Sequence, residues 1–151
     1  MTPPPGFAHG FYQVKISAIL HNYVHRKKLG RVVVETGVVT ERDPDTVRGP
    51  DVSYWSKESL PLDELPRGYP DVPADLCVEV LSPKDRPAKV RRKVIEYFAR
   101  GVRLVWVVDP KTKSVVVHRS PNDCETIDIN GVLEGGDIVR GFRCSVADVF
   151  E

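Results

Sequence analysis

The sequence predicts a single α/β domain built around a mixed β-sheet with helices packed on it. Two observations favour this class. Helical and strand patterns alternate along the chain, in the order helix, strands, helix, strands. Two strand segments, 75–81 and 103–109, are apolar on both faces, which is typical of strands buried on both sides of a sheet. With 151 residues, the chain is long enough to bury one sizeable core without disulfide or metal staples.

The first forty residues predict an arm, a helix and a strand. Residues 1–8 resemble a loose arm, so we expect the domain proper to span 9–151. Apolar residues recur at helical spacing over 9–28, and Gly30 closes that helix. The run of β-branched residues over 31–40 predicts one strand.

The middle of the chain predicts two strands separated by loops. Turn residues over 41–50 predict a connection, and 51–55 predicts a short strand. A proline-rich loop then runs to about residue 73. The buried strand 75–81 follows it and enters the second helix.

The last third predicts a helix and further strands. The helix follows a cap at 82–85 and ends before Gly101, a residue that suits a helix C-terminus. Strands are expected at 103–109 and 114–118, with a short segment at 146–150 closing the chain. Between them, short strands surround turn residues (Asn130-Gly131 and Gly135-Gly136-Asp137).

Composition indicates an ordinary globular protein. Hydrophobic residues make up 41% and charged residues 28%, which excludes a disordered tail, a collagen-like repeat and a coiled coil. No apolar run approaches the ~18 residues of a membrane helix, and the N-terminus lacks a signal-peptide pattern. We therefore expect a cytoplasmic protein without membrane contact. Three widely spaced cysteines argue against a disulfide framework and a structural zinc site (Cys77, Cys124 and Cys144).

Two carboxylates suggest a metal site. Glu79 is the only charge inside a strand that is apolar on both faces, and desolvating a carboxylate is costly unless it is paired, protonated or metal-bound. A functional site and a structural ion pair both stay open for Glu79 alone. Asp51, which opens the preceding strand, is by itself typical of a turn. Together on adjacent strands, however, the two residues could hold one Mg²⁺, which also takes waters and phosphate oxygens.

Basic residues supply the remaining candidates. The segment 84–100 carries seven basic and two acidic residues, and a second basic patch lies at 25–31, although the net charge is only +1. Lys93 lies beside the apolar stripe of its helix, so its stem could carry the ammonium to the sheet edge; otherwise it is a solvated lysine. Candidates for contacts with substrate phosphates are His9, Arg86 and Lys89, and Glu35 is either a further acid or a solvent-facing strand residue.

Four motifs in order carry a resemblance to a known family. They are Gly49-Pro50-Asp51-Val52, then Val78-Glu79-Val80-Leu81-Ser82-Pro83, then Lys93-x-x-x-Tyr97-x-x-x-Gly101-Val102, and finally Trp106-Val-Val-Asp109-Pro110. This series resembles that of the Uma-two family, restriction-endonuclease-like proteins of the PD-(D/E)xK nuclease superfamily. The resemblance covers the chain from about His9 to Phe150 and implies a restriction-endonuclease-like mixed sheet flanked by helices.

The resemblance also implies an activity. Asp51 and Glu79 would bind Mg²⁺ or Mn²⁺, and Lys93 would orient the attacking water or stabilise charge on the phosphorane. The strict superfamily pattern has its lysine two residues after the second acid, where this chain has Leu81; the family supplies a lysine from the helix instead. We therefore expect a metal-dependent endonuclease acting on nucleic acid, with DNA as the substrate.

Other interpretations stay open at this stage. Nucleases that cut both strands often act as two-fold dimers, so a homodimer is possible. The alternative function is a catalytically silent nuclease fold that binds nucleic acid or a partner protein. A third is a nuclease-like fold that acts on another substrate, because fold does not fix function.

Overall fold

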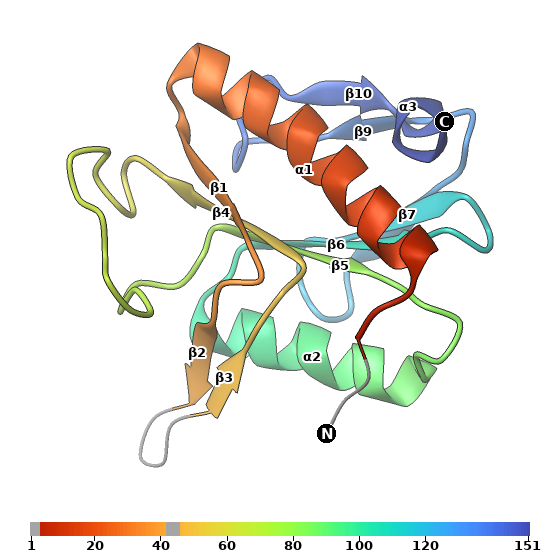
Figure 1. The fold of residues 1–151 in the computed structure, drawn as a ribbon, viewed down its shortest axis with the longest axis horizontal. Helices are drawn as coiled ribbons and strands as arrows, with labels where there is room; N and C mark the ends of the chain where they lie inside the picture. The colour runs from red at the N-terminus through yellow and green to blue at the C-terminus, as the bar shows by residue number, and fades with distance from the viewer. Residues whose placement is uncertain (1–3, 42–45) are drawn as a thin grey trace.

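The computed structural model describes residues 4–41 and 46–151, and a six-stranded mixed sheet forms its centre (Figure 1). The strand order is β1-β4-β5-β6-β7-β8, and only β5 and β6 pair in parallel. The bounds are β1 Gly30–Val34, β4 Val52–Ser56, β5 Leu76–Val80, β6 Leu104–Asp109, β7 Ser114–His118 and β8 Cys124–Ile127.

Helices cover both faces of this sheet. Helix α1 (Phe7–Lys27) crosses one face, and α2 (Pro87–Arg100), which joins the parallel strands β5 and β6, lies on the other (Figure 1). The α1 side also carries α3 (Val146–Phe150) and a hairpin of β9 (Val132–Glu134) and β10 (Arg143–Ser145). A second hairpin, β2 (Val38–Glu41) and β3 (Thr46–Arg48), extends beside α2 (Figure 1).

Successive side chains of the central strands point to opposite faces of the sheet, so the core forms two layers. In β4, Tyr54 packs into the α1-side cluster and Trp55 into the α2-side cluster. Every residue of β4 and β5 is buried. On the α2 side, Val94 and Tyr97 belong to one buried cluster with Cys77 of β5, so the apolar stripe of α2 fixes this helix on the sheet.

The mixed α/β fold expected from the sequence is confirmed, and so are its two doubly buried strands. Helix α1 begins at Phe7, two residues before the expected start. The prediction of one strand over 31–40 is wrong. The backbone of Glu35 adopts φ 54°, in the left-handed region, which ends the ladder of β1 and turns the chain into β2.

The expected connection over 41–50 is also wrong in part, because β3 lies within it and pairs with β2. The turn residues Asp43, Pro44 and Asp45 fall outside the described residues. Farther along, β8 and β9 flank Asn130-Gly131 without pairing with each other: β8 joins the main sheet, and β9 pairs with β10 across the glycine turn at 135–137. Within the described ranges, no helix is long and apolar enough to cross a membrane.

Candidate active site

Strand pairing brings Asp51 and Glu79 together. Strands β4 and β5 are antiparallel with Val52 opposite Val78, so the next position along the pair places Asp51 beside Glu79. The backbone N–H of Val80 donates a hydrogen bond to Asp51 Oδ2 at 2.7 Å, which ties the Asp51 carboxylate to the neighbouring strand. The two expected acids thus meet where β4 begins and β5 ends.

Helix α2 supplies the partners of Glu79. The Tyr97 hydroxyl donates to Glu79 Oε1 at 2.5 Å, and Lys93 Nζ lies 3.8 Å from Glu79 Oε2. Lys93 and Tyr97 are four residues apart and therefore share one side of the helix. Glu79 is 6% exposed, whereas the Lys93 side chain keeps 26% of its surface accessible. The structure thus brings Lys93 to Glu79, and the catalytic role expected for Lys93 stays a prediction.

The surroundings of Glu79 disfavour its ionised form. Burial, as the largest cause, raises the pKa of Glu79 to about 7, and the nearby Asp51 carboxylate acts in the same direction. Lys93 and the Tyr97 hydrogen bond lower this pKa, but they do not offset the burial. Burial and the Glu79 charge also raise the pKa of Tyr97, so its hydroxyl stays protonated and can only donate to the carboxylate.

Helix α1 holds Asp51 from the other side. His9 Nε2 lies 3.2 Å from Asp51 Oδ1, and the Gln13 amide, one turn later, donates to the Asp51 carbonyl at 3.0 Å. His9 Nδ1 is buried and has no hydrogen-bond partner in the described part of the chain. The structure therefore places His9 against Asp51, and its expected contact with substrate stays a prediction.

Basic side chains gather on the N-terminal half of α2. Arg86 and Lys89 precede Lys93 at spacings that keep all three on one side of the helix. Arg86 and Lys89, but not Lys93, line a cavity of about 330 Å³ together with Arg48, Ala88 and Arg92; it is called here the basic pocket. Arg48 comes from β3 and is held by Glu96, with Nε 2.5 Å from Oε2 and Nη2 2.9 Å from Oε1.

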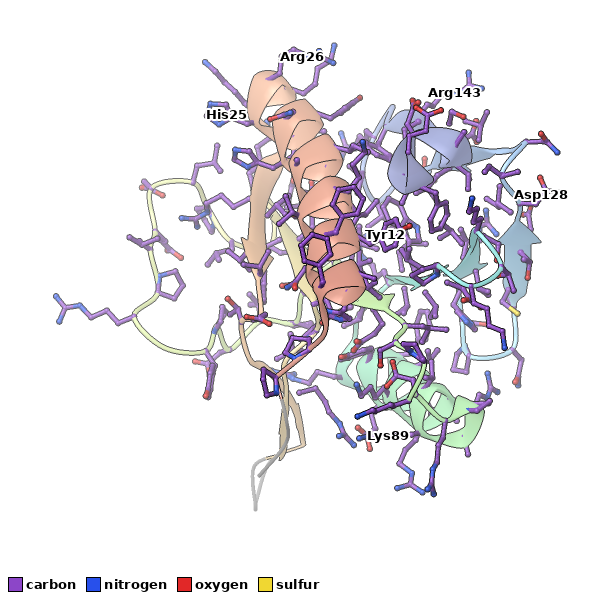
Figure 2. All side chains as sticks on the ribbon, turned by 45° about the vertical axis from the view of Figure 1, so that its right-hand side comes forward. Tyr12, His25, Arg26, Lys89, Asp128 and Arg143 are labelled. Atoms are coloured by element: carbon purple, nitrogen blue, oxygen red, sulfur yellow. The ribbon has the colours of Figure 1, made fainter. Side chains whose placement is uncertain are left out.

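Other basic residues point elsewhere. Arg91, although it is on α2, donates to the Pro121 carbonyl and to Asn122. His25 and Arg26 of the second patch lie at the opposite end of the molecule from Lys89 in Figure 2. The two basic patches of the sequence therefore do not form one continuous surface.

Comparisons with known proteins agree with this geometry. A family model, Uma2, described as "Putative restriction endonuclease", matches residues 1–147, nearly the whole chain. The chain belongs to the Uma2 family.

The fold of this Uma2 member is similar to a solved structure. The crystal structure is of "a putative nuclease belonging to DUF820" from Anabaena variabilis, with a TM-score of 0.85 and 20% sequence identity over 99% of this chain and 84% of that chain. This likeness confirms the restriction-endonuclease-like fold. No match was found among curated proteins.

The departure at Leu81 has a structural explanation. Leu81 lies two residues after Glu79, on the same side of the sheet, and packs against the α2-side core. An apolar side chain there contributes to packing, while α2 brings Lys93 to the Glu79 carboxylate instead. The lysine and the second acid are thus placed by different elements.

The donor set fits a hard divalent cation. In the described ranges, no group of three or more His, Cys, Asp and Glu residues is arranged as a closed metal site. Mg²⁺ does not require one, because it keeps several waters and binds through one or two carboxylates plus substrate phosphates. A cation between Asp51 and Glu79 would favour the ionised form of Glu79, which burial and the nearby Asp51 carboxylate disfavour.

Sequence reasoning missed three contributors to this site. Tyr97 is part of the third family motif but received no role of its own from the sequence, whereas in the structure its ring is buried and its hydroxyl binds Glu79. Nothing in the sequence singles out Gln13 or Arg48. Gln13 lies within a predicted helix, and Arg48 lies in a segment predicted to be a turn-rich connection. Their positions depend on contacts over 38 and 48 residues of sequence separation.

Burial of Glu79 predicts a pH-dependent stability. The folded chain keeps a proton on Glu79 up to about pH 7, whereas the unfolded chain releases it near the ordinary pKa of 4.5. The contribution of Glu79 to the free energy of unfolding therefore falls as the pH rises through this window. The glutamine in Glu79→Gln does not titrate, so the free energy of unfolding of this variant should not fall in this way. Relative to wild type it should rise by on the order of 2 kcal/mol across the window. Urea unfolding in EDTA at several pH values measures the difference.

The control for this experiment is Glu96→Gln. Arg48 lowers the pKa of Glu96, so the stabilisation by Glu96 is present above its ordinary pKa and is lost only as the pH falls below it. Glu96→Gln should therefore be destabilised by a constant amount over the window in which Glu79→Gln gains. If both variants show the same pH dependence, the assignment to Glu79 is wrong.

Removal of the Tyr97 hydroxyl should raise the pKa of Glu79 further, because that hydroxyl stabilises the ionised form. We expect Tyr97→Phe to raise it by about one unit, the equivalent of one hydrogen bond. Carbon-13 NMR of the glutamate carboxyl groups measures the titration. Tyr54→Phe, which removes a hydroxyl that binds Leu29 on the other face of the sheet, should leave the pKa of Glu79 unchanged.

Proposed function

We propose that this chain is a Mg²⁺- or Mn²⁺-dependent endonuclease that hydrolyses phosphodiester bonds in nucleic acid, with DNA as its substrate. One observation carries the proposal. Asp51 and Glu79 meet on neighbouring strands, and the Lys93 ammonium reaches Glu79 from α2. Membership of a family of restriction-endonuclease-like proteins supports the same reaction class.

The side chains have separable tasks in this proposal. Asp51 and Glu79 would hold the cation, which when bound polarises a phosphoryl oxygen and lowers the pKa of water. Tyr97 and the Val80 N–H keep the two carboxylates in place. His9 positions Asp51 from α1.

Lys93 is the residue proposed to act on the reacting phosphate. Its ammonium lies 3.8 Å from Glu79 and remains partly exposed, so a substrate oxygen could approach it from solvent. From this position it would orient the attacking water or stabilise the charge that develops at phosphorus. The basic pocket, one helical turn away, would hold a neighbouring phosphate of the same strand.

Cleavage by the Lys93→Ala variant tests the catalytic assignment. Loss of one such electrostatic contact should slow cleavage by about 10²–10³, with little effect on substrate binding. Glu79→Gln should be as inactive as Lys93→Ala, because it loses a ligand of the proposed cation. The assay is cleavage of single- and double-stranded DNA and RNA with Mn²⁺, with EDTA as a blank. Lys57→Ala, an exposed lysine at the other end of β4, is the matched control.

Two results would contradict this assignment. If Lys93→Ala cuts as fast as Lys57→Ala, Lys93 is a solvated cation without a catalytic role. If the wild type cuts none of the substrates, the chain is a catalytically silent nuclease fold. Measurement of molar mass in solution, with and without DNA, tests the possible homodimer in the same preparation.

The basic pocket predicts the salt dependence of binding. Each phosphate that the pocket neutralises should contribute about −0.9 to the log–log slope of affinity against salt. Lys89→Ala/Arg92→Ala should therefore flatten the slope for duplex DNA, measured in EDTA by fluorescence anisotropy. Arg91→Ala, on the same helix but bonded to Pro121 and Asn122, should keep the wild-type slope. Equal slopes in both variants would show that the pocket does not contact phosphate.

A further inference from the structure

A second cavity lies on the same side of the sheet as the acids. It has a volume of about 380 Å³ and lies between β1 and the loop that follows β4. We call it the β1 pocket. The residues that matter for its chemistry are Arg31, Glu35, Trp55, Leu65, Arg67 and Tyr69.

Glu35 joins this pocket to the candidate active site. Its backbone N–H donates to the Asp51 carbonyl at 3.3 Å, and its side chain lines the pocket. Trp55, on β4, lies four residues after Asp51. Because every second residue along a strand faces the same side of the sheet, both side chains lie on the α2 side. The β1 pocket therefore begins beside the backbone of Asp51, on the side of the sheet that carries both acids.

The backbone at Glu35 is unusual. Its φ of 54° lies in the left-handed region, which a residue other than glycine rarely adopts. This conformation ends β1 and starts the bend that lines the pocket. Strained backbone of this kind persists where surrounding structure enforces it, and such positions gather at ligand sites.

The lining matches a flat, partly apolar ligand attached to an anion. Trp55 and Leu65 provide apolar surface, and Tyr69 is 57% exposed and therefore free to stack. Arg31 and Arg67 outnumber the one carboxylate, Glu35, which favours a negatively charged ligand. Nucleobases stack on aromatic rings and guanidinium groups, and their phosphates bind arginine.

We propose that the β1 pocket holds one unstacked nucleobase of the substrate strand, next to the phosphodiester that is cut. The proposal rests on the proposed function, because it takes the substrate to be nucleic acid. A cavity of this size admits a single base and no stacked duplex. The substrate strand is therefore single-stranded or locally unpaired beside the site of cleavage.

Glu35 gives the pocket a preference among bases. An ionised carboxylate only accepts hydrogen bonds, so it favours a base edge that carries an exocyclic amino group. Cytosine presents such a donor at N4, whereas thymine presents the O4 acceptor at the same place. The pocket therefore selects cytosine over thymine.

Binding of single strands tests the pocket without any cleavage. The probes are fluorescein-labelled ten-residue oligonucleotides of deoxycytidine or thymidine and a duplex of the same length, all in EDTA at low salt. Wild type should bind the deoxycytidine strand at least about fivefold more tightly than the thymidine strand. Tyr69→Ala should weaken binding of the deoxycytidine strand about tenfold and leave duplex binding unchanged.

Matched variants separate the pocket from general effects. Leu62→Ala removes an exposed apolar residue of the same loop outside the pocket, so it should bind as wild type does. Glu35→Gln, whose amide can both donate and accept, should lose the preference for cytosine. Thermal unfolding of each variant confirms that the fold is kept.

The results distinguish this inference from the proposed function. If Tyr69→Ala binds like Leu62→Ala, or if wild type binds both strands equally, the β1 pocket is not a base site even when wild type cuts DNA. If the strand preferences hold but wild type cuts nothing, the base site stands and the endonuclease proposal fails.

Discussion

The cost of burying the Glu79 carboxylate shapes the whole site. Glu79 lies in the middle of the sheet, in a strand whose every residue is buried. Helix α2 provides two partners for this carboxylate: the Tyr97 hydroxyl, which donates a hydrogen bond, and the Lys93 ammonium. These two groups reduce the penalty without removing it, since the pKa of Glu79 remains about 7. The proposed cation would supply the compensation that these two groups leave incomplete.

The packing of α2 is inseparable from this chemistry. Val94 and Tyr97 place the helix against β5, and the same Tyr97 ring carries the hydroxyl that binds Glu79. The helix could not shift without loss of both the core contact and the hydrogen bond. On the opposite side, α1 fixes Asp51 through His9 and Gln13. Each acid is thus held by its own helix, and the sheet holds the two acids together.

The sequence predicted the parts of this site that have a local cause. Glu79 stood out because a single charge interrupted an apolar strand, and Lys93 because it flanked the apolar stripe of its helix. Glu35 could not be recognised as the end of a strand, because a left-handed residue other than glycine leaves no mark in a β-branched run. The pairing of Arg48 with Glu96 depends on the register of β3, which the sequence does not reveal. Long-range register and backbone strain account for most of what was missed.

The distances along the chain differ between the two halves of the site. Glu79 and Tyr97 are 18 residues apart, in one strand–turn–helix unit that also contains Lys93, whereas Gln13 reaches Asp51 over 38 residues. Contacts between residues close in sequence cost less chain entropy to form. The contacts of Glu79 with Tyr97 and Lys93 should therefore form early in folding, and the contact of Gln13 with Asp51 late. A chain that folds in this order would have Glu79, Lys93 and Tyr97 in place before Asp51 joins them, so the proposed cation site would be completed last.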